Sequence, residues 1–481
     1  MKKSFKETGN NFIIILLCIV LMIALLVRIV RQNRANIKYE SLDTFISDYQ
    51  KDDVGTNAVK SDENEVELSY DKNGNVITLL KSIIVDKEYV LDNVTLDLNN
   101  HTLYIKSPGH IQLNNSTITN GNINIETTSD TEEYNIIDVT GESSISNLTS
   151  LLSGTYIDVY LIKVNEGSIF TIENSEIYTS TCYAHRLYSI YSEGDTTVSN
   201  TILRLYNLSE EQEKKTYCSA IVSKQKSLKV HNCNIITENH SKYGASYGIY
   251  STIDSTILDI RGCDIYCDSR YLLLNGTYGS IAVGIIANSE ETIINECSVR
   301  GVHSGAQIGS ITASVSKSAF KSTGHGGIYF AQSRRKDDND SILPATYRVT
   351  DTTIAWCEPD GLFKQDVSDS AFCGNNRAAF YIGGSASGIN ISVYMDGCKI
   401  YGDLYSGVMR GTSGEHDNSL YVSNTEFDTP MRIDNETLEF QIGKGCNITY
   451  DTTFNWCKQG LIKYSDLPDS LIFFMPEKEF R

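Results

Sequence analysis

The sequence lacks several features that mark common classes of protein. Only six of its 481 residues are proline, and no C-x-x-C pair with partner histidines occurs. Without that cysteine–histidine pattern a structural zinc site has no support, and we expect no bound metal. Basic residues are also few, since 41 lysines and arginines face 60 aspartates and glutamates, for a formal net charge of −19. Nucleic-acid binding needs basic patches, so we expect no nucleic-acid partner.

The sequence does contain a six-residue phrase that returns along most of its length. The phrase reads apolar, any residue, a turn former such as Asn, then Ser, Thr or Cys, any residue, and Ile or Phe. Its thirteen copies, three of them looser, follow one another at steps averaging about 28 residues, which is the spacing of a solenoid coil. The copies begin at Leu91, Leu113, Ile145, Ile172, Val198, Val230, Ile260, Ile294, Val315, Val349, Val367, Met395 and Val422.

The spacing of the two apolar positions predicts a bend inside each copy. The positions are an odd number of residues apart, so one straight strand would place them on opposite faces. A sharp corner at the third position lets both side chains point inward. Asn, Gly and Asp suit such a corner because they tolerate left-handed backbone angles. Each copy is therefore predicted to be a strand, a one-residue corner and a second strand.

A further apolar segment predicts a third strand in most coils. Three short strands per coil, stacked coil on coil, make an all-β protein with a parallel β-helix of about 13 coils. The stretch LDNVTLDLNNHTLYI, from Leu91 to Ile105, and the repeats after it resemble the right-handed, pectin-lyase-like β-helix superfamily. The resemblance covers roughly residues 75 to 460. It implies the fold but no particular activity, because one fold hosts many activities. The third-strand segments begin at Tyr188, Ser219, Tyr247, Val283, Gly326, Asp360, Ala378 and Ser406.

The chain begins with an apolar run that predicts a membrane anchor. Residues 12–30 are apolar except for Arg28, and about 20 such residues span a bilayer. No small-x-small cleavage pattern follows, so residues 1–34 are predicted to be an uncleaved signal anchor, with a cleaved signal peptide as the alternative. Basic residues flank both sides, so charge does not set the orientation. We expect a single-pass protein of the cell membrane with its large domain extracellular, the commoner arrangement for a secreted-type solenoid.

The remaining chain divides into a stalk, two caps and the solenoid. The Asn73-Gly74 pair is a strong hairpin signal, and it begins a predicted cap for the open edge of the first coil. The predicted parts are a stalk over residues 35–70, an N-terminal cap over 71–90, the β-helix over 91–447, and a C-terminal coil and cap over 448–481.

Four cysteines share the fourth position of the phrase: Cys233, Cys263, Cys297 and Cys398. They are therefore predicted to stack in one interior column. Neighbouring coils lie about 4.8 Å apart, and parallel stacked Cβ atoms stay too far apart for a relaxed disulfide. We predict buried free thiols, with some disulfides as the alternative.

The residue after the inward apolar position of the third strand should face outward, and it is often aromatic. Stacked aromatic faces along a groove suit sugar rings, which present apolar C–H faces. The alternative is that tyrosine and phenylalanine are simply common in strands. The predicted sugar-binding residues are Tyr191, Tyr250, Tyr329, Phe363 and Tyr381.

A polar cluster between residues 324 and 377 could carry catalysis. A lyase acting on uronates must neutralise a carboxylate, often with calcium, and needs a base, whereas a hydrolase needs a carboxylate pair. Gly324-His325-Gly326 matches one element of polygalacturonase-like glycosidases, but the other elements are missing or out of order. The alternative is a solvated surface loop. The catalytic candidates are His325, Asp360, Lys364, Asp366 and Arg377.

Three functions fit these features. The first is a membrane-anchored extracellular protein that binds a polysaccharide or surface glycan. The second is a polysaccharide lyase or glycoside hydrolase with its site near residues 324–377, and the third is a rigid adhesin or spacer. The motifs require no cofactor, and calcium is the one that a lyase would add. The oligomeric state is left open.

Overall fold

The structure is a computed structural model, and it describes most of the solenoid. The predicted anchor, with its membrane-spanning residues 12–30, lies outside the described residues, as do residues 449–481. Within the described part no helix is long and apolar enough to cross a membrane. The described residues are 75–126, 129–209, 216–241, 244–269, 281–322, 326–356 except Arg334, Asp338 and Asp340, then 378–383, 391–402, 405–409, 418–427, 431–433, 438–442 and 447–448, with four short strands before residue 72.

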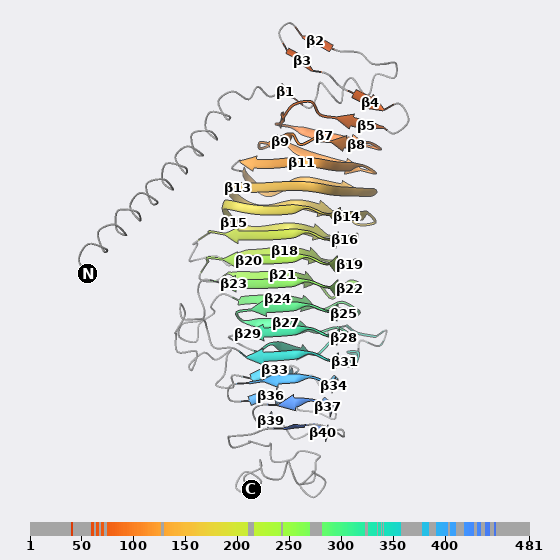
Figure 1. Cartoon of the computed structure of the whole chain (residues 1–481), viewed down its shortest axis with the longest axis vertical. Coiled ribbons are helices and arrows are strands. Elements are labelled where there is room, and N and C mark those ends of the chain that lie inside the picture. The colour runs from red at the N-terminus through yellow and green to blue at the C-terminus, as the bar shows by residue number, and fades with distance from the viewer. Residues whose placement is uncertain are drawn as a thin grey trace, which may run out of the picture.

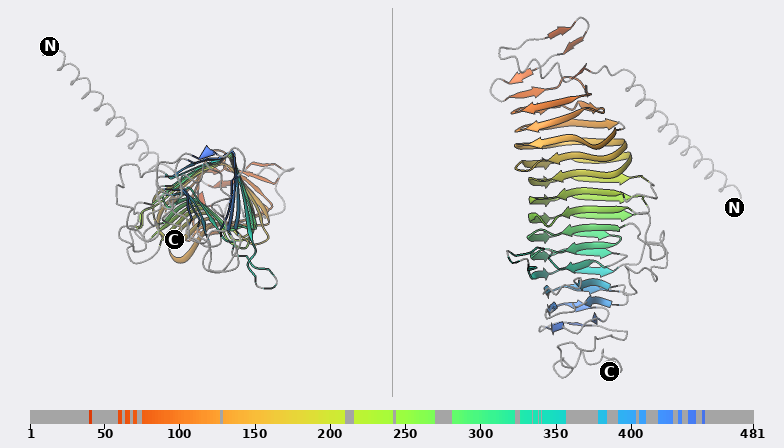
Figure 2. Two further views of the ribbon diagram at one scale, coloured as in Figure 1. Left: turned by 90° about the horizontal axis from the view of Figure 1, so that it is seen from below. Right: turned by 180° about the vertical axis from the view of Figure 1, so that it is seen from behind.

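The chain winds through three strand positions per coil and forms a parallel β-helix (Figure 1). Seen along the long axis, successive coils overlie one another around a common core (Figure 2). The sheet that contains the first strand of the phrase is called the first sheet. Its strands are β5 (Val76–Thr78), β8 (Thr95–Asp97), the starts of β11 (Thr117–Glu126) and β13 (Glu142–Val164), β14 (Ile169–Glu173), β16 (Asp195–Ser199), β19 (Lys226–His231), β22 (Ser255–Arg261), β25 (Glu291–Asn295), β28 (Thr312–Ser316), β31 (Ala345–Thr350), β34 (Ile391–Asp396), β37 (Asn418–Ser423) and β40 (Leu438–Ile442).

The second sheet follows the corner of the phrase, and the third sheet contains the third strand. The second sheet consists of β6 (Ile83–Val85), β9 (Thr102–Ile105), later parts of β11 and β13, the start of β15 (Glu176–Ser192), β17 (Ile202–Asn207), β20 (Asn234–Asn239), β23 (Asp264–Ser269), β26 (Ser298–Gly301), β29 (Ala319–Ser322), β32 (Thr353–Trp356), β35 (Lys399–Tyr401), β38 (Glu426–Phe427) and β41 (Asn447–Ile448). The third sheet consists of β7 (Glu88–Asp92), β10 (His110–Asn114), β12 (Ser129–Thr140), the ends of β13 and β15, β18 (Tyr217–Ser223), β21 (Ala245–Ser251), β24 (Ile281–Ala287), β27 (Ser304–Ile308), β30 (Ile328–Ala331), β33 (Ala378–Gly383), β36 (Tyr405–Met409) and β39 (Met431–Ile433).

Short strands precede the solenoid. Strand β1 (Glu40–Ser41) pairs with β6, and β2 (Val59–Ser61) pairs antiparallel with β3 (Asn64–Val66). Strand β4 (Ser69–Asp71) pairs antiparallel with β5, as predicted for the strands that flank Asn73-Gly74, while these two residues lie outside the described residues. Parallel coils begin before Leu91, since β5 and β6 already pair with β8 and β9.

The corner at the third position of the phrase is confirmed. In every copy that the structure describes, this residue has a positive φ, even where it is Glu296, Lys317 or Asp351 rather than Asn or Gly. The corner therefore depends on the backbone and not on one residue type. The corner residues are Asn93, Asn115, Asn147, Asn174, Asn200, Asn232, Gly262, Glu296, Lys317, Asp351, Gly397 and Asn424.

Two of the predicted copies lie at a different corner from the rest. Leu113 pairs with Leu91 and with Val139, so both of these copies lead from the third sheet into the first. The copy that stacks on Ile145 instead begins at Ile118, and its corner is Asn120. The two corners read alike in sequence because both need a residue that accepts left-handed angles.

A third copy, at Val367, lies outside the described residues, as does the predicted third strand at Asp360. On either side of this segment Val349 pairs directly with Met395, and Tyr329 pairs directly with Tyr381. Strand β40 adds a coil that the phrase does not predict, because Ile442 pairs with Val422. The coils thus do not correspond one to one with the thirteen predicted copies.

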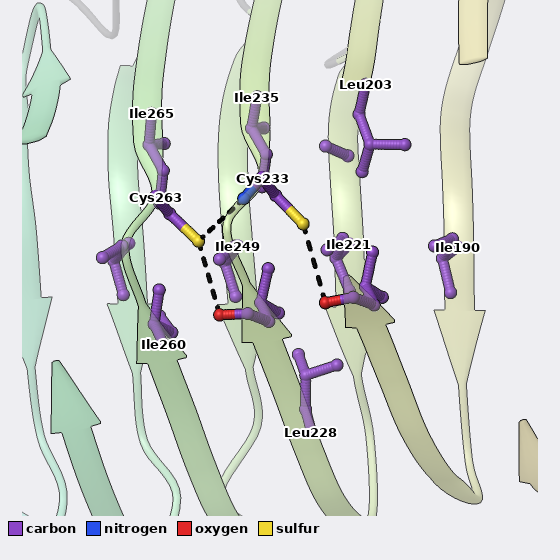
Figure 3. Packing of buried hydrophobic residues seen from close by; sticks show 14 of the residues in the cluster. Ile190, Leu203, Ile221, Leu228, Cys233, Ile235, Ile249, Ile260, Cys263 and Ile265 are labelled. Atoms are coloured by element: carbon purple, nitrogen blue, oxygen red, sulfur yellow. Dashed lines mark hydrogen bonds between the residues drawn. The ribbon is translucent and has the colours of Figure 1, made fainter. Parts of the chain in front are cut away.

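The interior is a continuous column of apolar side chains from the three sheets. Ile190, Ile221 and Ile249 lie on successive rungs of the third sheet and are fully buried (Figure 3). In the second sheet Leu203, Ile235 and Ile265 align in the same way. Alternation of buried and outward residues along each strand is what a pleated strand on a core requires.

The cysteine column is also present. Cys233, Cys263, Cys297 and Cys398 are buried and free, and they lie at the same corner position as Ser318 and Thr352. The Sγ atom of Cys263 donates to the carbonyl oxygens of Val230 and Arg261, and it accepts from the backbone N–H of Cys233 at 3.4 Å. Ser318 makes the equivalent contacts with Ser316 and Cys297. The thiols therefore act as hydrogen-bonding groups of the corner.

Replacing Cys263 with valine should lower the free energy of unfolding by about 1–3 kcal/mol, because the buried backbone N–H of Cys233 loses its acceptor and the carbonyl of Val230 loses the thiol donor. Serine should be much better tolerated, since a hydroxyl already fills this position in other coils. Denaturant unfolding of the full-length chain in a mild detergent measures both variants. An equal loss of stability for Cys263→Ser and Cys263→Val would contradict the hydrogen-bonding role.

Candidate functional site

The catalytic candidates of the polar cluster lie outside the described residues: His325, Asp360, Lys364, Asp366 and Arg377. Phe363, one of the predicted sugar-binding residues, also lies outside the described residues. Because β30 pairs directly with β33, the column of the third sheet runs from Tyr329 to Tyr381 without a rung for Phe363.

The other predicted binding residues share one outward column of the third sheet. Tyr191, Tyr250, Tyr329 and Tyr381 lie on aligned rungs, with Val222, Ile286 and Gln307 between them. The rung after Tyr381 is held by Val408. The coil of Gln307 had no predicted third strand.

The aromatic column is not a continuous open platform. Tyr381 is only 3% exposed and packs with Ala378 and Val408, and Tyr329 packs against this cluster. Tyr250 is half-buried, and its ring centroid lies 5.5 Å from that of Tyr247. The richest grouping of rings is at Tyr191, near the N-terminal end of the column.

Three tyrosines form a compact cluster on strands β13 and β15. The ring of Tyr160 lies 5.1 Å from that of Tyr188 and 5.0 Å from that of Tyr191, and the last two are 5.7 Å apart. Tyr160 and Tyr188 face each other across adjacent rungs, and Lys163 pairs with Tyr191 in the same way. Tyr160 is nearly buried, whereas Tyr188 and Tyr191 remain partly exposed. The cluster therefore offers two rings held in place by a third.

Charged side chains surround the cluster and are largely paired. Asp158 lies 3.2 Å from Nδ1 of His185 and 3.4 Å from Arg186. Lys163 contacts Glu133 at 2.5 Å, and its Nζ lies 5.7 Å from the centre of the Tyr160 ring. These groups supply both donors and acceptors at the edge of the rings.

The electrostatics follow from partial burial. Burial is the main cause that raises the pKa of Tyr188 and of Tyr191, the latter to about 12, so both hydroxyls stay protonated at neutral pH. Burial alone would lower the pKa of Lys163, but its hydrogen bond to Glu133 and the charges of Glu133, Asp138 and Glu193 raise it overall. At neutral pH the rings of Tyr188 and Tyr191 are thus uncharged, and the ammonium of Lys163 beside them is charged.

Exposed apolar side chains also lie on the two strands of the cluster. Ile157 and Tyr183 are 43% and 44% exposed, which places them among the most exposed large hydrophobic side chains of the described chain. They precede Asp158 and Arg186 on the same two strands. Strands β13 and β15 run from the second sheet into the third without an intervening loop (Figure 1). These two coils therefore contain no loop of their own that could cover the tyrosine cluster.

We call this surface the tyrosine patch. Sequence reasoning found Tyr191 and missed the remainder, because it recognised no third strand in the coil of Tyr160. Aligning VYLIKV with LYSIYS, which pair in register, would have shown Tyr160 above Tyr188. The patch consists of Tyr160, Tyr188 and Tyr191, the rim residues Glu133, Asp158, Lys163, His185 and Arg186, and the exposed residues Ile157 and Tyr183.

Among the described residues, no group of three or more histidine, cysteine, aspartate or glutamate side chains lies close enough together to hold a metal ion.

Comparisons with known proteins assign no activity. No family model matches the chain, and no curated protein matches its sequence. Among solved structures, a mutant of a periplasmic alginate epimerase is similar, with a TM-score of 0.40 and 10% identity over 76% of this chain and 86% of that one. A similarity of this degree carries no functional inference.

Proposed function

We propose that the chain is a membrane-anchored extracellular β-helix protein that binds a polysaccharide through the tyrosine patch. The observation that carries the proposal is the cluster in which the partly exposed rings of Tyr188 and Tyr191 pack on Tyr160 and on each other, 5.0–5.7 Å apart, beside paired charges. Sugar rings present apolar C–H faces that pack on aromatic rings and hydroxyls that bond to charged groups. The apolar run over residues 12–30 supports the anchor, since its length suits a bilayer.

One feature favours a second function, polysaccharide cleavage or modification. The carboxylate of Asp158 can fix the imidazole of His185, an arrangement that suits general acid or base chemistry. Tyr188, Tyr191 and Arg186 are on the same strand β15 as His185 and could position a sugar. The predicted site near residues 324–377 remains a separate proposal for the same class of reaction.

The first experiment mixes the full-length chain, in a mild detergent, with neutral, acidic and amine-bearing polysaccharides, with and without calcium. Binding, new reducing ends and the absorbance of unsaturated uronates are followed in the same samples. Binding without cleavage is the expected result. New reducing ends or new absorbance would establish the enzymatic function. The absence of both binding and cleavage would overturn the glycan-binding and the enzymatic function, and the rigid spacer or adhesin would remain.

A further inference from the structure

Around the tyrosine patch, carboxylates outnumber the lysines and arginines. Lys163 pairs with Glu133 and Arg186 pairs with Asp158, so each of these cations is already matched by one carboxylate. Two further carboxylates remain close by. Asp138 precedes Lys163 and Tyr191 in the outward column of the third sheet, and Glu193 acts electrostatically on both Lys163 and Tyr191.

This excess of carboxylates discriminates between kinds of glycan. An acidic glycan would bring its carboxylates or sulfates against Asp138 and Glu193, on a chain whose formal net charge is −19. These two carboxylates share Lys163 with its partner Glu133, so a neutral glycan would add no positive charge to balance them. A glycan with protonated amines would match them, and such pairs are stronger than neutral hydrogen bonds.

The aromatic rings suit a cation as well. The ammonium of Lys163 already lies 5.7 Å from the centre of the Tyr160 ring, within the range of a cation–π interaction. Tyr191 offers a further partly exposed ring on which Glu193 acts, and the ring of Tyr188 lies 5.7 Å from it. Asp138 lies two rungs from Tyr191 in the same column. Rings and carboxylates therefore occur together on one surface.

We infer that the tyrosine patch takes a polysaccharide with free amino groups, a polymer of de-N-acetylated hexosamine, whose ammonium groups contact Asp138 and Glu193 while the sugar faces pack on Tyr188 and Tyr191. The inference rests on the proposed glycan-binding function. Asp138 is partly buried, and burial raises its pKa while Lys163, His110 and a hydrogen bond with Asn135 oppose the rise. A partly buried carboxylate is further stabilised by each added cation.

The test compares two oligomers of equal length and linkage, β-1,4-linked glucosamine and its fully N-acetylated counterpart. Each is titrated against the full-length chain in a mild detergent, at a pH where the amines are protonated. We expect the amine form to bind on the order of tenfold more tightly, and added salt to reduce this preference because the contacts are ionic and partly exposed.

Two isosteric variants test the named carboxylates. Asp138→Asn together with Glu193→Gln should abolish the preference for the amine form. If the double variant folds poorly, Glu193→Gln alone is used instead and should reduce the preference. The control is Glu296→Gln, an exposed corner carboxylate paired with Lys317 on another part of the rod, which should keep the preference. Circular dichroism and thermal midpoints verify folding.

The outcomes separate the two proposals. Equal binding of both oligomers, or a preference that survives in the double variant, would overturn the amine specificity and leave glycan binding intact. No binding of either oligomer or of any other polysaccharide would overturn the glycan-binding function itself.

Discussion

Replacing Phe320 with alanine should lower the free energy of unfolding by about 3–5 kcal/mol. Phe320 is fully buried on β29 and lies between Val299 and Ile354 on the neighbouring rungs. Alanine would leave a cavity that the stacked strands cannot close, because their spacing is fixed by hydrogen bonds to the coils on either side. Denaturant unfolding of the full-length chain in a mild detergent measures the loss.

The location of the damage is as informative as its size. Each coil of a solenoid contacts only its neighbours, so faster amide exchange should concentrate in β26, β29 and β32 and spare β10 to β13. Lys321→Ala, an exposed change on the same strand, is the control and should change stability by less than about 0.5 kcal/mol. Uniformly faster exchange along the chain after Phe320→Ala would contradict the nearest-neighbour stacking.

The double variant Tyr188→Ala and Tyr191→Ala should lower the affinity for the bound polysaccharide at least tenfold. An aromatic contact contributes about 0.5–1.5 kcal/mol beyond the area that it buries, and a loss of about 1.4 kcal/mol corresponds to a factor of ten. Two such rings are removed here while Tyr160, the more buried member, stays in place. Titration of the polysaccharide selected by the binding panel measures the change.

The chain offers a matched control for this variant. Tyr394 and Tyr421 lie on adjacent strands of the first sheet, with ring centroids 4.5 Å apart and planes at 9°. Replacing both with alanine removes the same two rings from another face and should leave affinity unchanged. A loss of affinity from the Tyr394 and Tyr421 pair, with none from the patch, would place the binding surface on the first sheet.

The sequence was sufficient to predict the stacking and the corner because both are local requirements. A left-handed residue between two inward apolar positions can be recognised within six residues, as at Asn174 or Gly262. The burial of Cys233 and Cys263 followed from the same phrase. Local pattern could not separate the two corners of a coil, which is why the copies at Leu91 and Leu113 were placed in the wrong sheet.

The patch could not be predicted in full because it depends on alignment between coils. Tyr160 and Tyr188 are 28 residues apart in sequence and meet only through the register of β13 with β15. The burial of Tyr381 depends on its contacts with Ala378 and Val408, which alternation along a strand does not reveal. Likewise, the phrase does not reveal that the rungs of Val349 and Met395 pair directly.

Hydroxyl-radical footprinting with mass spectrometry would test the central claim, that the tyrosine patch binds the glycan, most directly. The full-length chain is oxidised with and without saturating polysaccharide, and the modification of each side chain is compared. Protection should appear at Tyr183, Tyr188 and Tyr191, with none at Tyr394 and Tyr421. Saturated binding that leaves the first three side chains as reactive as before would contradict the account.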